Sequence, residues 1–323
     1  MRVLIPYPAA PDSFQDNVAY TLQKLRHEVL TAPLSLRSKS GPGSLLLERA
    51  MLRAFPRRWN RFERWVVKAA QEFKPQMVLC LTQSLREEVL RALKLAGVER
   101  CVVWWGDPAA NIRDMGLLSD HWDALYIKNP MVVQKLRAVG LNAHLMHEAC
   151  NPDWHLPQNK ARDGSIAIVG NCYGYRQFIS HRLIEQYDDV RIYGPAVPHW
   201  GLESVKASHQ NKYVVKQEKS AVFDSAALCL NSTNFTEADN LNCRAFEICG
   251  AGGLQAIENK PAVAMCFEPD KEVLVYNTVE EIVELAHRAQ RDTKWAQAIR
   301  DAGHRRAHSE HTYEDRLKKI LAS

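Results

Sequence analysis

The stretch Ser165-Ile-Ala-Ile-Val-Gly170-Asn-Cys-Tyr-Gly-Tyr-Arg176 joins a continuous apolar run to a glycine turn and a more polar segment. Continuous short apolar runs that alternate with helical segments indicate parallel strands covered on both faces. The sequence therefore predicts an α/β protein. Further runs of this kind lie at 2–6, 77–81, 101–105, 124–127, 143–146, 190–194, 226–231 and 254–257.

A segment rich in Pro, Asn, Lys and Asp, residues 151–163, divides the alternation into two halves. A chain of 323 residues is long enough for two α/β domains, each with its own core. We expect two Rossmann-like, doubly wound domains facing each other across a cleft, at 1–155 and 156–305. Ligands of such sheets bind at the carboxyl ends of the strands.

Composition and charge are those of a globular enzyme, with 46% hydrophobic and 24% charged residues. No apolar run approaches the ~20 residues that a membrane span needs. Residues 1–6 begin a strand and do not have the pattern of a signal peptide. Eight scattered cysteines include no Cys-x-x-Cys pair, so we expect buried thiols in a reducing cytoplasm and no zinc site. The net charge of +5 is too small to demand a nucleic-acid partner.

The stretch Asp239-Asn-Leu-Asn-Cys-Arg-Ala-Phe-Glu247 runs into a glycine cluster that ends at Gly253. If Arg244 begins a helix, the N–H groups around Asn240 and Asn242 and the Arg244 side chain favour a phosphate or diphosphate. Glu247, one turn further, is then placed to accept hydrogen bonds from a ribose diol. A capped helix that ends at a glycine explains the same spacing equally well.

The loop after Gly170 carries Asn171 and Arg176, and a basic side chain near a helix start can neutralise a diphosphate. The alternative is a surface arginine on an ordinary helix. The strand at 190–194 ends at Gly194, in a Tyr-Gly-Pro turn at the same predicted edge of the sheet.

The block from Leu230 to Gln255 and the tail from Glu268 resemble the C-terminal half of the CgeB-like (spore maturation) glycosyltransferases. These are relatives of the group-1 retaining glycosyltransferases, which have the GT-B fold. The resemblance covers residues 165 to 320. The matching elements are Asn231, Asn242-x-Arg244-x-Phe246-Glu247, Glu268-Pro-x-Lys-Glu272 and His311-Thr-Tyr-Glu-x-Arg316.

The resemblance implies a metal-independent, retaining enzyme that moves a hexosyl or pentosyl group from a UDP-sugar, with no cofactor. The chain has no Asp-x-Asp dyad, which agrees with that chemistry. It also implies an acceptor-binding first domain, a donor-binding second domain and a helix at 306–323 that crosses back to the first. Asp239, which replaces the first glutamate of the family's E-x7-E pattern, is expected at the sugar hydroxyls. The implied donor and diphosphate site consists of Asn171, Arg176, Gly194, Asn240, Asn242, Arg244 and Glu247.

Candidate acceptor contacts lie in the first half of the chain and at the hinge. Asp107, which we group with Asp239 and Glu247 as catalytic, is held in a Gly-Asp-Pro turn, although it can equally cap the next helix. His147 follows the last strand of the first half, where a structural role is the alternative.

Residues 37–68 contain nine Lys or Arg and two Glu, interleaved with aromatic residues. This stretch suits a phosphate-bearing acceptor such as DNA, a teichoic-type polymer or an anionic lipid surface. A basic helical hairpin that shields the core is the alternative. The candidate acceptor residues here are Arg57, Arg58 and Arg61.

Three functions remain open at this level: a glycosyltransferase acting on a glycan or protein, a DNA-modifying glycosyltransferase, and a non-catalytic binding protein with the same fold.

His304, His308 and His311 share helical spacing, and their basic surroundings predict a solvated helix surface and no metal site.

Overall fold

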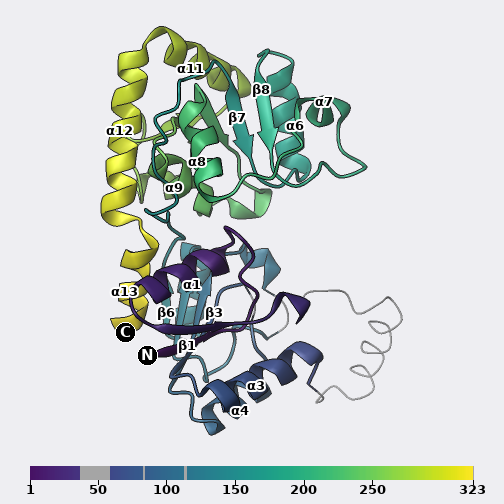
Figure 1. Ribbon diagram of the computed structural model, residues 1–323, viewed down its shortest axis with the longest axis vertical. Helices are drawn as coiled ribbons and strands as arrows, with labels where there is room; N and C mark the ends of the chain where they lie inside the picture. The colour runs from purple at the N-terminus through teal and green to yellow at the C-terminus, as the bar shows by residue number, and fades with distance from the viewer. Residues whose placement is uncertain (37–58, 83, 113–114, 323) are drawn as a thin grey trace. The chain divides into compact units, whose positions relative to one another are not determined.

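The computed structural model describes residues 1–36, 59–82, 84–112 and 115–322 (Figure 1). The chain divides into two compact units, Met1–Met146 and His147–Ala322. Each unit contains one parallel β-sheet with helices between its strands. The predicted fold of two Rossmann-like α/β domains is therefore confirmed.

The first unit has a six-stranded sheet in the order β2-β1-β3-β4-β5-β6. Every residue of β3 and β5 is buried, because helices cover both faces of a parallel sheet. Its strands are β1 (Arg2–Ile5), β2 (Glu28–Thr31), β3 (Met77–Cys80), β4 (Arg100–Trp105), β5 (Ala124–Ile127) and β6 (Ala143–Leu145). Its described helices are α1 (Phe14–Lys24), α3 (Arg61–Phe73), α4 (Glu87–Leu95), α5 (Pro130–Ala138) and the 3₁₀ turns η1 (Leu34–Leu36) and η2 (Ala109–Asn111).

The second unit has a five-stranded sheet in the order β11-β10-β9-β7-β8. Its strands are β7 (Ile166–Val169), β8 (Val190–Tyr193), β9 (Leu228–Asn231), β10 (Gln255–Glu258) and β11 (Leu274–Tyr276). Its helices are α6 (Gly174–Ile184), α7 (Glu203–Ser208), α8 (Lys216–Ser225), α9 (Cys243–Gly250), α10 (Pro261–Ala264), α11 (Val279–Arg291), α12 (Thr293–Glu310), α13 (Tyr313–Ala322) and the 3₁₀ turn η3 (Phe235–Glu237).

Two strands lie outside the predicted apolar runs, and both are at the edge of a sheet. The residues of β2 are exposed or half-buried, so the strand carries no continuous apolar signal. β11 contains three residues. Edge strands are covered less than central ones, and their sequences are correspondingly harder to distinguish from loops.

Alternate residues of β7 face two different cores in the second unit. Ile166 and Ile168 pack with residues of α6 and α11. Ala167 and Val169 pack with residues of α8 and α9. Helices from both faces therefore bring their first turns to the carboxyl edge of this sheet, where β7 and β9 end.

The segment that follows Met146 packs against the second unit. Cys150 N donates to the His311 carbonyl at 2.9 Å, and Tyr313 N donates to the Cys150 carbonyl at 3.0 Å, which ties the start of the unit to α13. Further along, the buried Asp224 carboxylate accepts from the Gln158 N–H and from Arg162 Nη1. Residues 151–163 lack regular secondary structure, as their linker composition predicts.

No helix in the described residues is both long and apolar enough to cross a membrane.

Candidate functional site

The carboxyl edge of the second sheet is built around Gly170, the residue after β7. Its φ of +129° lies in a region that favours glycine. A Cβ at this position would overlap the Arg244 guanidinium and lie 2.9 Å from Nη1 of Arg176. The missing side chain at Gly170 thus lets two arginines from different helices meet over the end of one strand.

Gly194, at the end of β8, supports the same turn. Its φ is +142°, and a Cβ there would lie 2.5 Å from the Gly170 carbonyl oxygen. The Gly170 N–H donates to the Tyr193 carbonyl at 2.8 Å. The two strand ends are therefore packed backbone to backbone, so Gly194 has a steric role beside the predicted site.

Arg176, on the first turn of α6, is buried, with 3% of its surface exposed. Its Nε donates to Ser232 Oγ at 3.1 Å and its Nη2 donates to the Ser232 carbonyl at 2.6 Å. Its Nη1 donates to the backbone carbonyl of Asn171. Asn171 itself is an exposed residue. Arg176 therefore ties the loop after β7 to the loop after β9.

Burial and the nearby charge of Arg244 lower the pKa of Arg176 to about 10. The group stays protonated at neutral pH, so two positive charges lie side by side at this edge. Arg244 is half-buried, and its Nε has no hydrogen-bond partner in the described part of the chain. Among the described residues, no carboxylate forms an ion pair with Arg176 or Arg244. Like charges that lie side by side without an ion-paired carboxylate favour binding of an anion.

The two asparagines just before α9 have different roles. Asn242 caps α9, because its Oδ1 accepts from the Ala245 N–H at 3.2 Å. Its Nδ2 donates to Asn231 Oδ1 at 3.0 Å. Asn240 is fully buried, yet neither atom of its carboxamide has a hydrogen-bond partner among the described residues. A buried carboxamide without partners marks a place where a bound molecule can supply them.

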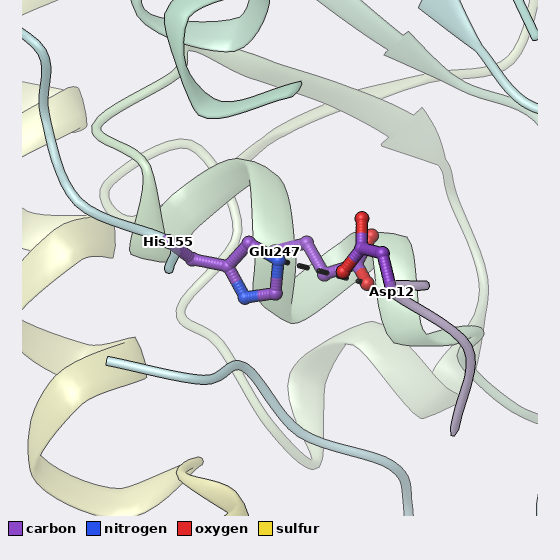
Figure 2. A group of neighbouring side chains, drawn as sticks. All are labelled: Asp12, His155 and Glu247. Carbon is purple, nitrogen blue, oxygen red and sulfur yellow. Dashed lines mark ion pairs between the residues drawn. The ribbon is translucent and has the colours of Figure 1, made fainter. Parts of the chain in front are cut away.

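Glu247 lies one turn into α9 and has 3% of its surface exposed. Its Oε2 is 2.9 Å from Nζ of Lys219, a buried residue of α8. Figure 2 shows the imidazole of His155 beside the same carboxylate, with its Nε2 3.9 Å from Oε1. That distance is an ion-pair separation and exceeds hydrogen-bond length. The Lys219 ammonium thus holds a buried carboxylate at the edge that Arg244 also occupies, and the His155 ring, whose Nδ1 accepts from the Asn151 N–H, lies beside it.

Asp239 is half-buried in the turn between η3 and α9. The predicted site residues from Asp239 to Asn242 lie in this turn, and Arg244 and Glu247 lie in the helix that follows it. The predicted helix begins at Cys243, one residue before Arg244, and its C-cap is Ala251.

Asp107 lies in the first unit, in the loop after β4, where it is half-buried. Its Oδ2 accepts from Asn111 Nδ2 at 3.4 Å. The residue before η2 is Pro108, and that 3₁₀ turn has no side-chain cap. The Asp107 carboxylate therefore contacts the last residue of this turn.

His147 is a buried residue of the second unit, and its carbonyl accepts from Arg316 Nε at 3.3 Å. The centroid of its ring lies 6.3 Å from the centroid of the Phe246 ring.

Of the three arginines predicted to bind the acceptor, Arg61 is exposed at the start of α3. Arg57 and Arg58 lie outside the described residues.

The predicted solvated surface for the three histidines near the C-terminus is wrong for His311. His311 is buried, its Nε2 is 2.8 Å from the Cys266 carbonyl, and its Nδ1 accepts from Arg316 Nη2. Burial is the main cause that lowers the pKa of His311 to about 4. His304 and His308 are half-buried, and a ring nitrogen of each lies within 3.0 Å of the Gly250 carbonyl. Helical spacing places the three on one face, and that face packs on the protein.

Two residues of the site were not among those predicted. Gly170 is visible in the sequence as the end of the strand run, but its contact with two arginines depends on its backbone angle. Lys219 carries no sequence signal, because its pairing with Glu247 joins two helices far apart in the chain.

Comparison with known proteins agrees with this architecture. Residues 176–322 match the family described as "Glycosyl transferase-like". No curated protein matches the chain in sequence. Three solved structures illustrate the shared fold. Sucrose-phosphate synthase from Thermosynechococcus elongatus has a TM-score of 0.67 at 12% identity, over 99% of this chain and 98% of that one.

The HepE protein of Anabaena, solved in complex with UDP-glucose, has a TM-score of 0.68 at 10% identity, over 99% of both chains. The lipopolysaccharide outer core galactosyltransferase WaaB has a TM-score of 0.61 at 9% identity, over 100% of this chain and 99% of that one. At these identities the likeness establishes the fold, which is the GT-B fold, and the match to the glycosyl transferase-like family lies within the second unit.

Proposed function

We propose that this protein is a metal-independent, retaining glycosyltransferase that uses a UDP-sugar as donor. The observation that carries the proposal is the pair of arginines over Gly170, with which no described carboxylate forms an ion pair. A glycosyl transfer leaves a nucleoside diphosphate, and the growing negative charge on it must be stabilised. Two fixed guanidinium groups at a strand end can supply that stabilisation without a divalent ion.

The two arginines have different tasks in this proposal. Arg244 contacts the diphosphate directly, because it is half-buried and its Nε has no described partner. Arg176 acts mainly through position and charge, because its donors already hold Ser232 and the Asn171 carbonyl. The first N–H groups of α9 add favourable partial charge.

The nucleoside and the sugar are assigned to opposite ends of the same stretch. Glu247 accepts from the ribose hydroxyls, and Lys219, whose Nζ is 2.9 Å from Oε2, orients it. Asp239 and Asn240 bind the transferred sugar, whose hydroxyls can satisfy the unpaired Asn240 carboxamide. Asn242 contributes through the cap of α9, which fixes where the helix begins.

Retention follows if the acceptor hydroxyl attacks the anomeric carbon from the face that the diphosphate leaves. The C–O bond to the diphosphate breaks as the bond to the acceptor oxygen forms, and the acceptor proton passes to a departing phosphate oxygen. No protein nucleophile is needed for this course. The residues described above act by binding, orienting and stabilising charge.

The comparisons support the donor class through the HepE structure, which was solved in complex with UDP-glucose. The CgeB-like subgroup remains part of the proposal, on the motif Asn242-x-Arg244-x-Phe246-Glu247. Asp107 and His147 are retained as acceptor candidates, with a glycan or protein as the acceptor. All eight cysteines are free thiols within the described residues, which supports a cytoplasmic location.

The test incubates the protein with a panel of UDP-sugars in the presence of EDTA. Release of UDP is measured by chromatography. We expect slow hydrolysis of one donor by the wild-type protein and at least a tenfold loss in Arg244→Ala, since a charge-assisted contact is worth ~1.5–3 kcal/mol. Lys294→Ala, which removes an exposed cation on α12, is the matched control. Activity that requires Mg²⁺, or that persists in Arg244→Ala, would reject the proposed role of the arginines.

A further inference from the structure

Two aromatic side chains meet at the carboxyl edge of the second sheet. Tyr175 lies on the first turn of α6, and Phe235 begins η3 in the loop after β9. Their ring centroids are 4.8 Å apart, with 45° between the planes. Tyr175 is half-buried, whereas Phe235 has 77% of its surface exposed. One ring therefore supports a second ring that is open to solvent.

The position of this pair is fixed by the hydrogen bonds beneath it. Arg176 joins α6 to Ser232 through both Nε and Nη2. The hydroxyl of Tyr173 donates to the Ser232 carbonyl at 2.9 Å. Because these bonds tie the start of α6 to the start of the β9–α9 loop, Tyr175 and Phe235 are held next to the arginine pair.

The contacts also order the groups across the edge. Glu247 and Lys219 belong to α9 and α8, whose residues pack on one face of β7. Tyr175 belongs to α6, which packs on the other face. The arginines meet over Gly170, at the end of the strand between these helices. A nucleotide-sugar with its ribose at Glu247 and its diphosphate over Gly170 thus has its sugar on the side of Tyr175.

We propose that Phe235, supported by Tyr175, is a platform on which a hexopyranose ring stacks. The C–H face of a pyranose is apolar, and an exposed aromatic face complements it. Polar side chains flank the ring as a sugar requires: Asn234 and Thr236 are its neighbours, and Asp239 follows in the same loop. This inference rests on the proposed function and extends it to a sugar-binding surface.

The pyranose has two possible sources, the donor and the acceptor, and the experiment separates them. Calorimetric titrations use UDP, UDP-glucose, UDP-galactose and UDP-N-acetylglucosamine as donor probes. Cellobiose, maltose and chitobiose, each added in the presence of UDP, serve as acceptor probes. The proteins compared are wild type, Phe235→Ala and Phe235→Trp.

Phe178→Ala is the matched control, because Phe178 is also an exposed phenylalanine, 55% exposed, and lies on α6. Phe235 is exposed, so its truncation should leave the melting temperature unchanged. We expect unchanged UDP affinity in all variants. In Phe235→Ala, affinity for at least one sugar-bearing probe should fall about three- to tenfold, the range typical of an aromatic contact. Phe235→Trp should retain that affinity.

A loss confined to UDP-sugars assigns the platform to the donor, and a loss confined to the disaccharides assigns it to the acceptor. The inference is overturned if the wild type binds no UDP-sugar more tightly than it binds UDP and also binds none of the disaccharides. It is equally overturned if Phe235→Ala matches Phe178→Ala for every probe. Failure to bind UDP at all would instead reject the donor site on which the inference depends.

Discussion

Asn240 offers a test in which the structure predicts an unusual result. A buried asparagine is normally stabilised by its hydrogen bonds, but neither carboxamide atom of Asn240 has a partner among the described residues. Leaving a buried polar group unpaired costs ~1–3 kcal/mol. Asn240→Ala removes this cost and leaves a small cavity worth about 1 kcal/mol. We therefore expect the free variant to be as stable as wild type or more stable by up to ~2 kcal/mol.

Asn231 provides the matched comparison. It is equally buried, but its Nδ2 donates to Asn242 Oδ1 and to Gln255 Oε1, and its Oδ1 accepts from Asn242 Nδ2. Asn231→Ala leaves these partners unsatisfied, so we expect a loss of about 2 kcal/mol or more.

The assay is urea denaturation of the free proteins, monitored by circular dichroism. The urea concentrations at the transition midpoint are compared between the variants and wild type. A second series adds UDP or UDP-glucose. If the sugar satisfies the carboxamide, Asn240→Ala keeps the stabilisation by UDP and loses the extra stabilisation by UDP-glucose. The reasoning is refuted if Asn240→Ala destabilises the free protein as much as Asn231→Ala does.

Three further predictions concern single positions. Gly170→Ala should keep the fold but weaken UDP binding at least tenfold in calorimetry, because the new methyl group displaces Arg244 and the φ of +129° disfavours alanine; unchanged affinity would show that the arginines need not meet there. Glu247→Leu should destabilise the protein by ~3–5 kcal/mol in urea melts, because it removes the carboxylate beside Lys219; adding Lys219→Met should restore stability but not UDP binding, and restored binding would remove the ribose role of Glu247. The pKa of His311, depressed to about 4 in the folded protein, predicts that stability is full above pH 6.5 and falls by roughly 3 kcal/mol as the pH drops from 6.5 to 4; a His311→Gln variant with the same pH dependence in urea melts would contradict this.

The sequence predicted the fold well because parallel strands buried on both faces carry a strong signal. β3 and β7 coincide with the apolar runs at 77–81 and 165–170, since every residue of each strand is buried. β2 and β11 are edge strands and lack that signal. Local chemistry also predicted the helix that carries Arg244 and Glu247, because capping and helical spacing are properties of neighbouring residues.

The parts of the site that the sequence did not reveal depend on tertiary contacts. Helical spacing places His304, His308 and His311 on one face, but only packing decides whether that face is solvated or buried. Arg176 was predicted to bind the diphosphate, with a surface arginine as the alternative, and its burial and its hydrogen bonds to two loops had no signal in the local sequence. The partner of a buried side chain on a distant helix, as with Lys219, leaves no local pattern.

Calorimetric titration of UDP in EDTA, into wild type and Arg244→Ala, tests the central claim most directly. The account predicts binding to wild type without a divalent ion and at least tenfold weaker binding to the variant, with an unchanged melting temperature. Binding only in the presence of Mg²⁺, or equal binding by both proteins, would contradict it.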